Sequence, residues 1–171
     1  MHKPATTRRQ PETGTTVDNN DILRRIRYSF DLSDSKMIAI FNHADYLVTR
    51  EQISDWLKKD EDPALKKLND SLLATFLNGF IIERRGKKEG PQPVPEKRLS
   101  NNIVFTKLKI ALNLKAEDIL EILNLSGVNI SKHELSAFFR KPDHKHYREC
   151  KDQILRNFIH GLQLKYRDNM Q

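Results

Sequence analysis

The segment NNDILRRIRYSFDL at residues 19–32 returns as NNIVFTKLKIALNL at residues 101–114. The same offset continues without a gap, so that residues 19–86 align with residues 101–168. Because a repeated sequence pattern requires a repeated structural unit, we predict that one fold is used twice. Identical pairs at this offset include Leu32/Leu114, Ile40/Ile122, Asn42/Asn124, Ser54/Ser136, Lys59/Lys141, Asp70/Asp152, Leu73/Leu155, Phe76/Phe158, Gly79/Gly161 and Arg85/Arg167.

The size and composition of the chain indicate a soluble globular protein. Its 171 residues are 37% hydrophobic and 31% charged. No apolar run approaches the roughly 18 residues that are needed to cross a bilayer. Two units of about 70 residues each lie near the lower size limit for an independent core, so we expect the two copies to pack together.

The termini and the cysteine content favour a cytoplasmic protein. Residues 1–18 are rich in Thr, Pro and Arg and have no apolar centre, so we interpret them as a disordered tail rather than a secretory signal. Residues 169–171 are expected to form a short C-terminal tail. Cys150 is the only cysteine, which excludes an internal disulfide and suits a reducing compartment.

The net charge of +7 is unevenly distributed along the chain. Residues 1–18 contain three basic and two acidic residues, and residues 19–86 contain eleven of each. Residues 87–100 contain four basic and two acidic residues, and residues 101–171 contain twelve and eight. The excess positive charge lies in the linker and the second copy, which makes an anionic partner for that end of the molecule worth testing.

Each copy is predicted to begin with two short helices. Helix-spaced apolar residues follow each Asn pair, and Asn19-Asn20 and Asn101-Asn102 are expected to cap this first helix. A second helix is expected around residues 37–41 and 119–123. Nothing in either copy alternates with a period of two over the length of a strand, which favours an all-α fold.

The third and fourth helices have the clearest boundaries. TREQ at residues 49–52 and SKHE at residues 131–134 both match a capping box, so a third helix is predicted to begin there. The fourth helix of the first copy is predicted at residues 70–85. Gly86 is expected to end it by adopting the left-handed conformation that terminates many helices.

Gly79 and Gly161 lie inside the predicted fourth helices, where glycine costs about 1 kcal/mol relative to alanine. A close helix crossing would explain them, and contact between the two copies is one candidate for that crossing. Residues 87–100 contain alternating prolines and are interpreted as an extended polyproline-type linker. The predicted architecture is all-α, with two tandem four-helix repeats of about 70 residues, at 19–86 and 101–168, packed together.

The second and third helices of each copy are predicted to form a helix-turn-helix-like element. Gly127-Val128 is a familiar turn signal, whereas the first copy has Asp45-Tyr46 at this point. The turn is longer than the compact form, and the third helix mixes Glu51 and Asp55 with its basic residues. Such a shape is more common as a packing element than as a DNA-binding element.

His144, His146 and Cys150 are weak candidates for metal ligands. A structural zinc site needs four ligands, and the sequence offers no second pair of cysteine or histidine residues at a suitable spacing. Cys150 aligns with Leu68 of the first copy, so we expect its side chain to face the core. No Gly-rich phosphate loop is present. We therefore expect no catalytic residue, metal or cofactor, and a metal- or cysteine-dependent enzyme is the least favoured interpretation.

Basic residues make the better case for a function. Three groups of them lie on the linker, on the first helix of the second copy and before its last helix. If these groups converge on one face, they can engage several phosphates of a nucleic acid. An ordinary solvated face is an equally good interpretation. The candidates are Lys87, Lys88, Lys97, Arg98, Lys107, Lys109, Arg140, Lys141, Lys145 and Arg148.

The sequence leaves the partner open. We expect a non-catalytic binding or regulatory protein, with nucleic acid as the first partner to test and no membrane partner. The alternative is an adaptor that binds another protein or a second copy of itself, through grooves between its helices that accept an apolar segment.

Several motifs together resemble a known bacterial family. They are the two Asn-Asn starts, FLNGFIIERRGKK at residues 76–88, PEKRLSNNIV at residues 95–104 and PDHKHYRECKDQILRNF at residues 142–158. The chain resembles the YehS-like proteins, a domain family of unknown function. The resemblance implies a small, cytoplasmic bacterial protein with two tandem copies of the domain. It implies no activity, cofactor or catalytic residue.

Overall fold

A computed structural model describes residues 17–168, which form eight α-helices and no strand. The prediction of an all-α fold with four helices in each copy is confirmed. The first copy contains α1 (Asn19–Ser29), α2 (Asp34–His43), α3 (Arg50–Leu57) and α4 (Asp70–Arg85). The second contains α5 (Asn101–Ala111), α6 (Ala116–Leu125), α7 (Lys132–Ala137) and α8 (Asp152–Leu162), which continues into a π-helical turn, η1 (Gln163–Arg167). None of these helices is both long enough and apolar enough to span a bilayer.

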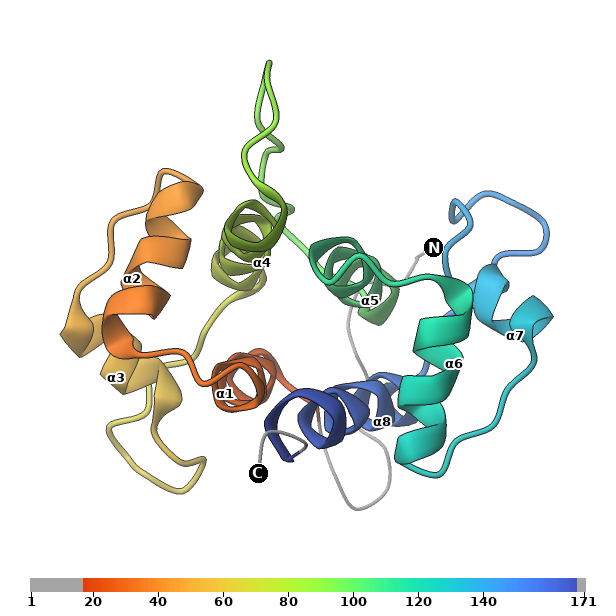
Figure 1. Ribbon diagram of the computed structural model, residues 1–171. Coiled ribbons are helices and arrows are strands. Elements are labelled where there is room, and N and C mark those ends of the chain that lie inside the picture. The colour runs from red at the N-terminus through yellow and green to blue at the C-terminus, as the bar shows by residue number, and fades with distance from the viewer. Residues whose placement is uncertain (1–16, 169–171) are drawn as a thin grey trace, which may run out of the picture.

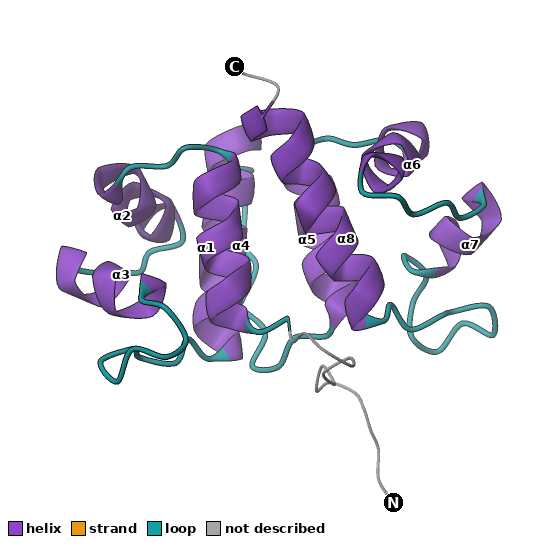
Figure 2. Cartoon of the chain, turned by 90° about the horizontal axis from the view of Figure 1, so that it is seen from below, coloured by secondary structure: helices purple, strands orange, loops and turns teal. Residues whose placement is uncertain are grey.

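The first and last helices of the two copies form the centre of the molecule. Figure 1 shows α1, α4, α5 and α8 side by side, with α2 and α3 on one flank and α6 and α7 on the other. Figure 2 shows the same division from below. Between the copies, α4 contacts α5 and α1 contacts α8. Because α1 corresponds to α5 and α4 to α8, these contacts exchange when the copies are interchanged, so the copies pack as a pseudo-symmetric pair.

One hydrophobic core runs through both copies. Phe41, Phe76 and Phe80 are fully buried in the first copy, and Phe105 and Phe158 are fully buried in the second. All five belong to one continuous cluster of buried residues. Burial of each such ring contributes about 1.5–3 kcal/mol to stability. A repeat of about 70 residues is too small to bury this much apolar surface by itself, so the shared core stabilises both copies. The expectation that the two copies pack together is therefore confirmed.

The paired asparagines do not cap the first helices, so that prediction is wrong. The caps lie one residue earlier: Asp18 accepts a hydrogen bond from the backbone N–H of Asp21, and Ser100 accepts one from Ile103. All four asparagines occupy the first turns and are buried. Their amides reach distant backbone groups instead, and capping by the preceding residue leaves them free to do so.

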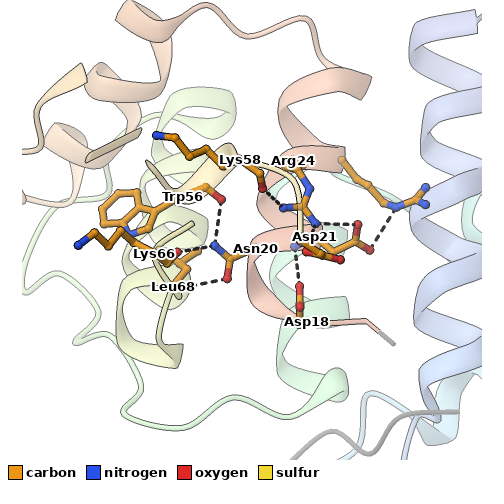
Figure 3. Close-up of polar contacts among 10 residues, drawn as sticks. Asp18, Asn20, Asp21, Arg24, Trp56, Lys58, Lys66 and Leu68 are labelled. Carbon is orange, nitrogen blue, oxygen red and sulfur yellow. Dashed lines mark hydrogen bonds and ion pairs between the residues drawn. The ribbon is translucent and has the colours of Figure 1, made fainter. Parts of the chain in front are cut away.

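The second asparagine of each pair fastens the irregular segment that follows the third helix. Asn20 Nδ2 donates to the carbonyl oxygens of Trp56 at 2.9 Å and Lys66 at 2.8 Å, and Asn20 Oδ1 accepts from the N–H of Leu68 at 3.0 Å. Figure 3 shows this clamp. Asn102 repeats all three contacts in the second copy, with the equivalent backbone groups of Phe138, Arg148 and Cys150. The loop between α7 and α8 is thereby held against α5.

The predicted starts of the third helices and the predicted bounds of α4 are confirmed, but the third helices end at Leu57 and Ala137, before the expected ends near Lys59 and Lys141. Both capping boxes form: the Gln52 side chain accepts from the N–H of Thr49, and Glu134 accepts from that of Ser131. Helix α4 has the predicted bounds, and Gly86 follows it at φ 88°.

The glycines inside α4 and α8 mark close crossings within each copy. A Cβ on Gly79 would lie 1.9 Å from the carbonyl oxygen of Ile40 in α2, and a Cβ on Gly161 would lie 2.2 Å from that of Ile122 in α6. The predicted helix crossing is confirmed. The suggestion that these glycines join the two copies is wrong, because their neighbours belong to the same copy.

The predicted tail and linker need correction. Residues 1–16 and 169–171 lie outside the described residues. Val17 is 3% exposed and Asp18 caps α1, so these two residues belong to the fold rather than to a tail. The linker is not an extended spacer, because it turns back at Gly90, where φ is 88°. It projects away from the helices above α4 in Figure 1 and returns to the core at Leu99, which is buried.

Candidate functional site

A cleft of about 570 Å³ opens where the two copies meet. It is bounded by the C-terminal half of α4, the linker, α5 and the loop between α7 and α8. The loop lies here because the Asn102 clamp holds it against α5, and the linker lies here because it connects the end of α4 to the start of α5. The cleft is therefore a product of the junction, with walls from both copies.

The walls of the cleft are mainly apolar. Ile81 and Ile82 come from α4, Ile103 and Ile110 come from α5, and Phe138 contributes its ring from the end of α7. The uncharged and acidic polar residues of the lining are Asn78, Gln92, Glu96, Ser100, Asn102, Thr106 and Tyr147, and four cationic residues, Arg85, Lys88, Lys107 and Arg140, join them. Apolar walls with a few convergent polar groups are typical of ligand-binding sites.

Lys107 is not a surface cation, which corrects its place among the candidate nucleic-acid contacts. The residue is 8% exposed, and its Nζ lies 2.6 Å from Asn78 Oδ1 and 3.1 Å from Glu96 Oε1. A buried ammonium group is stable only when it is paired and hydrogen-bonded, and these two partners supply that. Lys107 therefore joins α5 to α4 and to the linker.

The remaining basic candidates fall into two sets. Lys88 and Arg140 line the cleft. Lys109 is half-buried on α5, with its Nζ 5.1 Å from the centre of the Phe139 ring, and does not line the cleft. The other candidates are exposed on the linker and on the loop before α8, the two segments that flank the cleft; these are Lys87, Lys97, Arg98, Lys141, Lys145 and Arg148.

The exposed cations of these two segments lack close carboxylate partners. Within residues 17–168, no ion pair within 4.0 Å involves the basic residues of the linker or of the loop before α8. The first copy differs at one position: Lys58, which is equivalent to Arg140, lies 2.6 Å from Asp55, whereas the second copy has Ala137 at the position of Asp55. Loss of that carboxylate leaves Arg140 without its counterpart's ion pair.

The first copy carries a hollow of about 790 Å³ on the corresponding face, and its chemistry is different. Arg24 stands at the position of Thr106 and donates to the Lys58 carbonyl oxygen at 2.8 Å and to Asp60 at 3.1 Å. Figure 3 shows Arg24 reaching the Lys58 carbonyl from α1. Arg167, which also lines this hollow, pairs with Asp31 at 2.9 Å. Cations there are neutralised by carboxylates of the protein itself.

The candidate metal ligands do not come together. Cys150 is 1% exposed and belongs to the core, as its alignment with Leu68 predicts, and burial raises the pKa of its thiol to about 12. His144 and His146 are exposed, and the His146 N–H donates to His144 Nδ1 at 2.9 Å. Within residues 17–168, no three His, Cys, Asp or Glu side chains form a set that could hold a metal ion.

The first basic residues of α3 and α7, which belong to the predicted helix-turn-helix-like elements, make polar contacts with the preceding helix of the same copy. Arg50 at the start of α3 donates to Ser35 Oγ of α2 at 2.9 Å. At the equivalent position in α7, the ammonium group of Lys132 lies 3.0 Å from Glu117 of α6. A DNA-binding role for these elements stays a prediction, and the site described above does not include them.

Sequence reasoning missed the cleft itself and three of its polar residues, Asn78, Arg85 and Glu96. For Asn78 a signal exists where the two copies differ, whereas Arg85 is identical to Arg167 and Glu96 lies in the linker, which has no counterpart. Asn78 aligns with His160, and Thr106, which also lines the cleft, aligns with Arg24. Positions at which a duplicated fold changes residue type are candidates for a property that only one copy has.

Comparison with known proteins places the chain in a family. The family described as "Protein of unknown function (DUF1456)" matches twice in tandem, over residues 19–86 and 101–168. The chain belongs to this family. It is 44% identical over 145 residues to the uncharacterized protein YehS of Escherichia coli (strain K12), and the match covers 84% of this chain and 93% of YehS. No solved structure matches the chain. The resemblance and its tandem copies are confirmed, and the function has to be argued from the site.

Proposed function

We propose that this protein is a non-catalytic nucleic-acid-binding protein that uses the basic rim of the cleft. The rim consists of the linker cations Lys87, Lys88, Lys97 and Arg98 and the loop cations Arg140, Lys141, Lys145 and Arg148. The observation that carries the proposal is that linker and loop flank the same cleft, while their cations have no carboxylate within 4.0 Å in the described part of the chain. Such cations can exchange their counterions for phosphates.

The difference between the copies supports the same proposal. The loop at residues 138–148 contains four basic residues and one acidic residue, whereas its equivalent at residues 56–66 contains three of each. Charge that served only solubility would not need to concentrate on one of two equivalent loops. Phosphate contacts would benefit from this concentration, because neighbouring cations raise the local potential.

The absence of a catalytic role is part of the proposal and is supported by the state of Cys150. A nucleophilic cysteine needs a depressed thiol pKa and access to a substrate. Cys150 has neither, because burial raises its pKa to about 12 and its side chain lies in the core.

A fluorescence anisotropy titration tests the proposal. Labelled single-stranded DNA, single-stranded RNA and duplex DNA are each titrated with the full chain at about 50 mM and about 200 mM salt. We expect saturable binding at the lower salt that weakens steeply at the higher salt, with a slope of about 0.7–0.9 log units per phosphate contact. Failure of all three probes to bind at low salt would overturn the proposal, and salt-independent binding would point to apolar docking instead.

A further inference from the structure

We propose that the cleft itself is a binding site for a small amphipathic anion, with an apolar body and one carboxylate or phosphate head group. The inference goes beyond nucleic-acid binding and does not depend on it. It rests on unpartnered donors inside the cleft, on the charge of its lining and on the apolar character of its walls.

The first argument is the side-chain amide of Asn78. Asn78 is 5% exposed, and its Oδ1 accepts a hydrogen bond from Lys107. Its Nδ2 is buried and has no hydrogen-bond partner within residues 17–168. Buried amide donors are nearly always paired, because an unmet donor loses its water without compensation. An acceptor oxygen on a ligand in the cleft would supply the missing partner.

The second argument is a further unmet donor on the opposite wall. Arg140 Nε, from the loop before α8, is also buried without a partner in the described residues. Arg85 and Lys88 add two exposed cations at the end of α4 and the start of the linker. Glu96 Oε1 lies 3.1 Å from Lys107 Nζ in an ion pair, but within residues 17–168 it accepts no hydrogen bond. The remaining charge of the lining is positive, which matches an anionic head group.

The third argument is the shape and lining of the space. About 570 Å³ lies in the range of small-molecule sites, and its walls include four isoleucines and the Phe138 ring. A small anion without an apolar body would leave these apolar walls exposed to water. An apolar body beside the head group would cover them, and the burial of each methylene contributes about 0.8 kcal/mol.

The corresponding hollow of the first copy explains why only one such site is proposed. Ile103 and Ile110 of the cleft align with Asp21 and Tyr28, and Thr106 aligns with Arg24. Arg24 there pairs with Asp60 at 3.1 Å. The cations that line this hollow are all paired with carboxylates, so the hollow is less apolar than the cleft and offers an anion no unpaired cation.

Methyl-detected NMR with three matched probes tests the inference. Decanoate, decyl phosphate and 1-decanol are titrated into the full chain labelled at the isoleucine methyl groups. We expect saturable shifts at Ile81, Ile82, Ile103 and Ile110 with at least one of the two anions, and about tenfold weaker binding of the alcohol. The tighter of the two anions identifies the head group. No saturable shift with either anion, equal affinity for the alcohol, or shifts spread to Ile38 and Ile154 would overturn the inference.

A pair of matched variants keeps the test independent of folding. Ile110 is exposed at the edge of the cleft, so Ile110→Asp should fold normally and weaken binding of the anion at least tenfold by placing a carboxylate beside it. Leu125→Asp makes the same change at an exposed leucine outside the cleft and should leave the affinity unchanged. Equal affinity of the Ile110→Asp variant and the wild type would contradict the assigned site.

Discussion

At the scale of the residue, buried asparagine amides form specific long-range hydrogen bonds that hold the fold together. Asn20 and Asn102 each pair with three backbone groups that lie 36 to 48 residues away in the sequence. The sequence showed that the Asn pairs recur, but a local rule assigned them to helix capping. Long-range partners of this kind cannot be inferred from local spacing, because they depend on where the loop returns.

The clamp makes a prediction for Asn102→Asp. The variant keeps an acceptor for the Cys150 N–H but replaces the amide donor that serves Phe138 and Arg148 with an oxygen. We expect a loss of about 3 kcal/mol in the free energy of unfolding, since a buried and a partly buried carbonyl group lose their donor. Urea denaturation measures it. Asn124→Asp, at an exposed asparagine, is the control and should change stability by less than about 0.5 kcal/mol.

Glu83 makes a prediction for the pH dependence of stability. Its carboxylate accepts from Lys36 Nζ at 2.9 Å and lies 2.9 Å from His43 Nε2. The hydrogen bond from Lys36, followed by that from His43, holds the pKa of Glu83 below its usual value of 4.5. A carboxylate with a lowered pKa stabilises the fold above its unfolded pKa, and this contribution is lost as the pH falls through the folded pKa.

The variant Glu83→Gln removes this titration. We expect it to have a lower Tm than the wild type at neutral pH, and the difference should shrink as the pH drops below about 4.5. Thermal unfolding followed by circular dichroism across this range measures the effect. A Tm difference that stays constant down to strongly acidic pH would contradict the role given to the carboxylate.

At the scale of the element, the starts of the third helices could be predicted from the sequence, whereas the caps of the first helices could not and the helix crossings could be predicted only in part. Capping boxes depend on residues three positions apart, so TREQ and SKHE predicted the starts of α3 and α7 correctly. The internal glycines predicted a helix crossing but not the partner helix. A glycine inside a helix indicates that another segment packs closely there, but it does not identify that segment. The predicted course of the linker was also wrong. The linker has to turn back because it joins α4 to α5, which pack against each other, and local sequence does not show that contact.

The crossings predict the effect of alanine at Gly79 and Gly161. Alanine favours a helix over glycine by about 1 kcal/mol, so helix propensity alone would make both variants more stable. The added methyl group would instead meet a backbone carbonyl oxygen at 1.9 Å or 2.2 Å. We expect each variant to lose about 2 kcal/mol or more in the free energy of unfolding. Stabilisation of either variant in a urea titration would refute the crossing.

At the scale of the whole molecule, the duplication was evident from the sequence and the cleft was not. The repeat predicted two packed copies, and the charge count placed the positive excess in the linker and the second copy. The sequence did not show that Lys107 is buried beside Asn78 and Glu96, because burial at the junction depends on how the two copies pack. Nor did it show which basic segments share a face, which needs the fold of the linker.

The most direct test of the account compares equivalent loops of the two copies. The triple variant Lys141→Gln, Lys145→Gln and Arg148→Gln removes three loop cations of the basic rim, and the matched variant Lys59→Gln, Lys66→Gln and Lys67→Gln removes three exposed cations between α3 and α4 of the first copy. Anisotropy titrations with the best-bound nucleic acid are run over a range of salt. We expect the triple variant to bind more weakly, with its salt slope reduced by about 0.7–0.9 for each lost contact, while the matched variant behaves as the wild type. Equal weakening by both variants, or no change in slope for the triple variant, would contradict a binding face confined to the cleft.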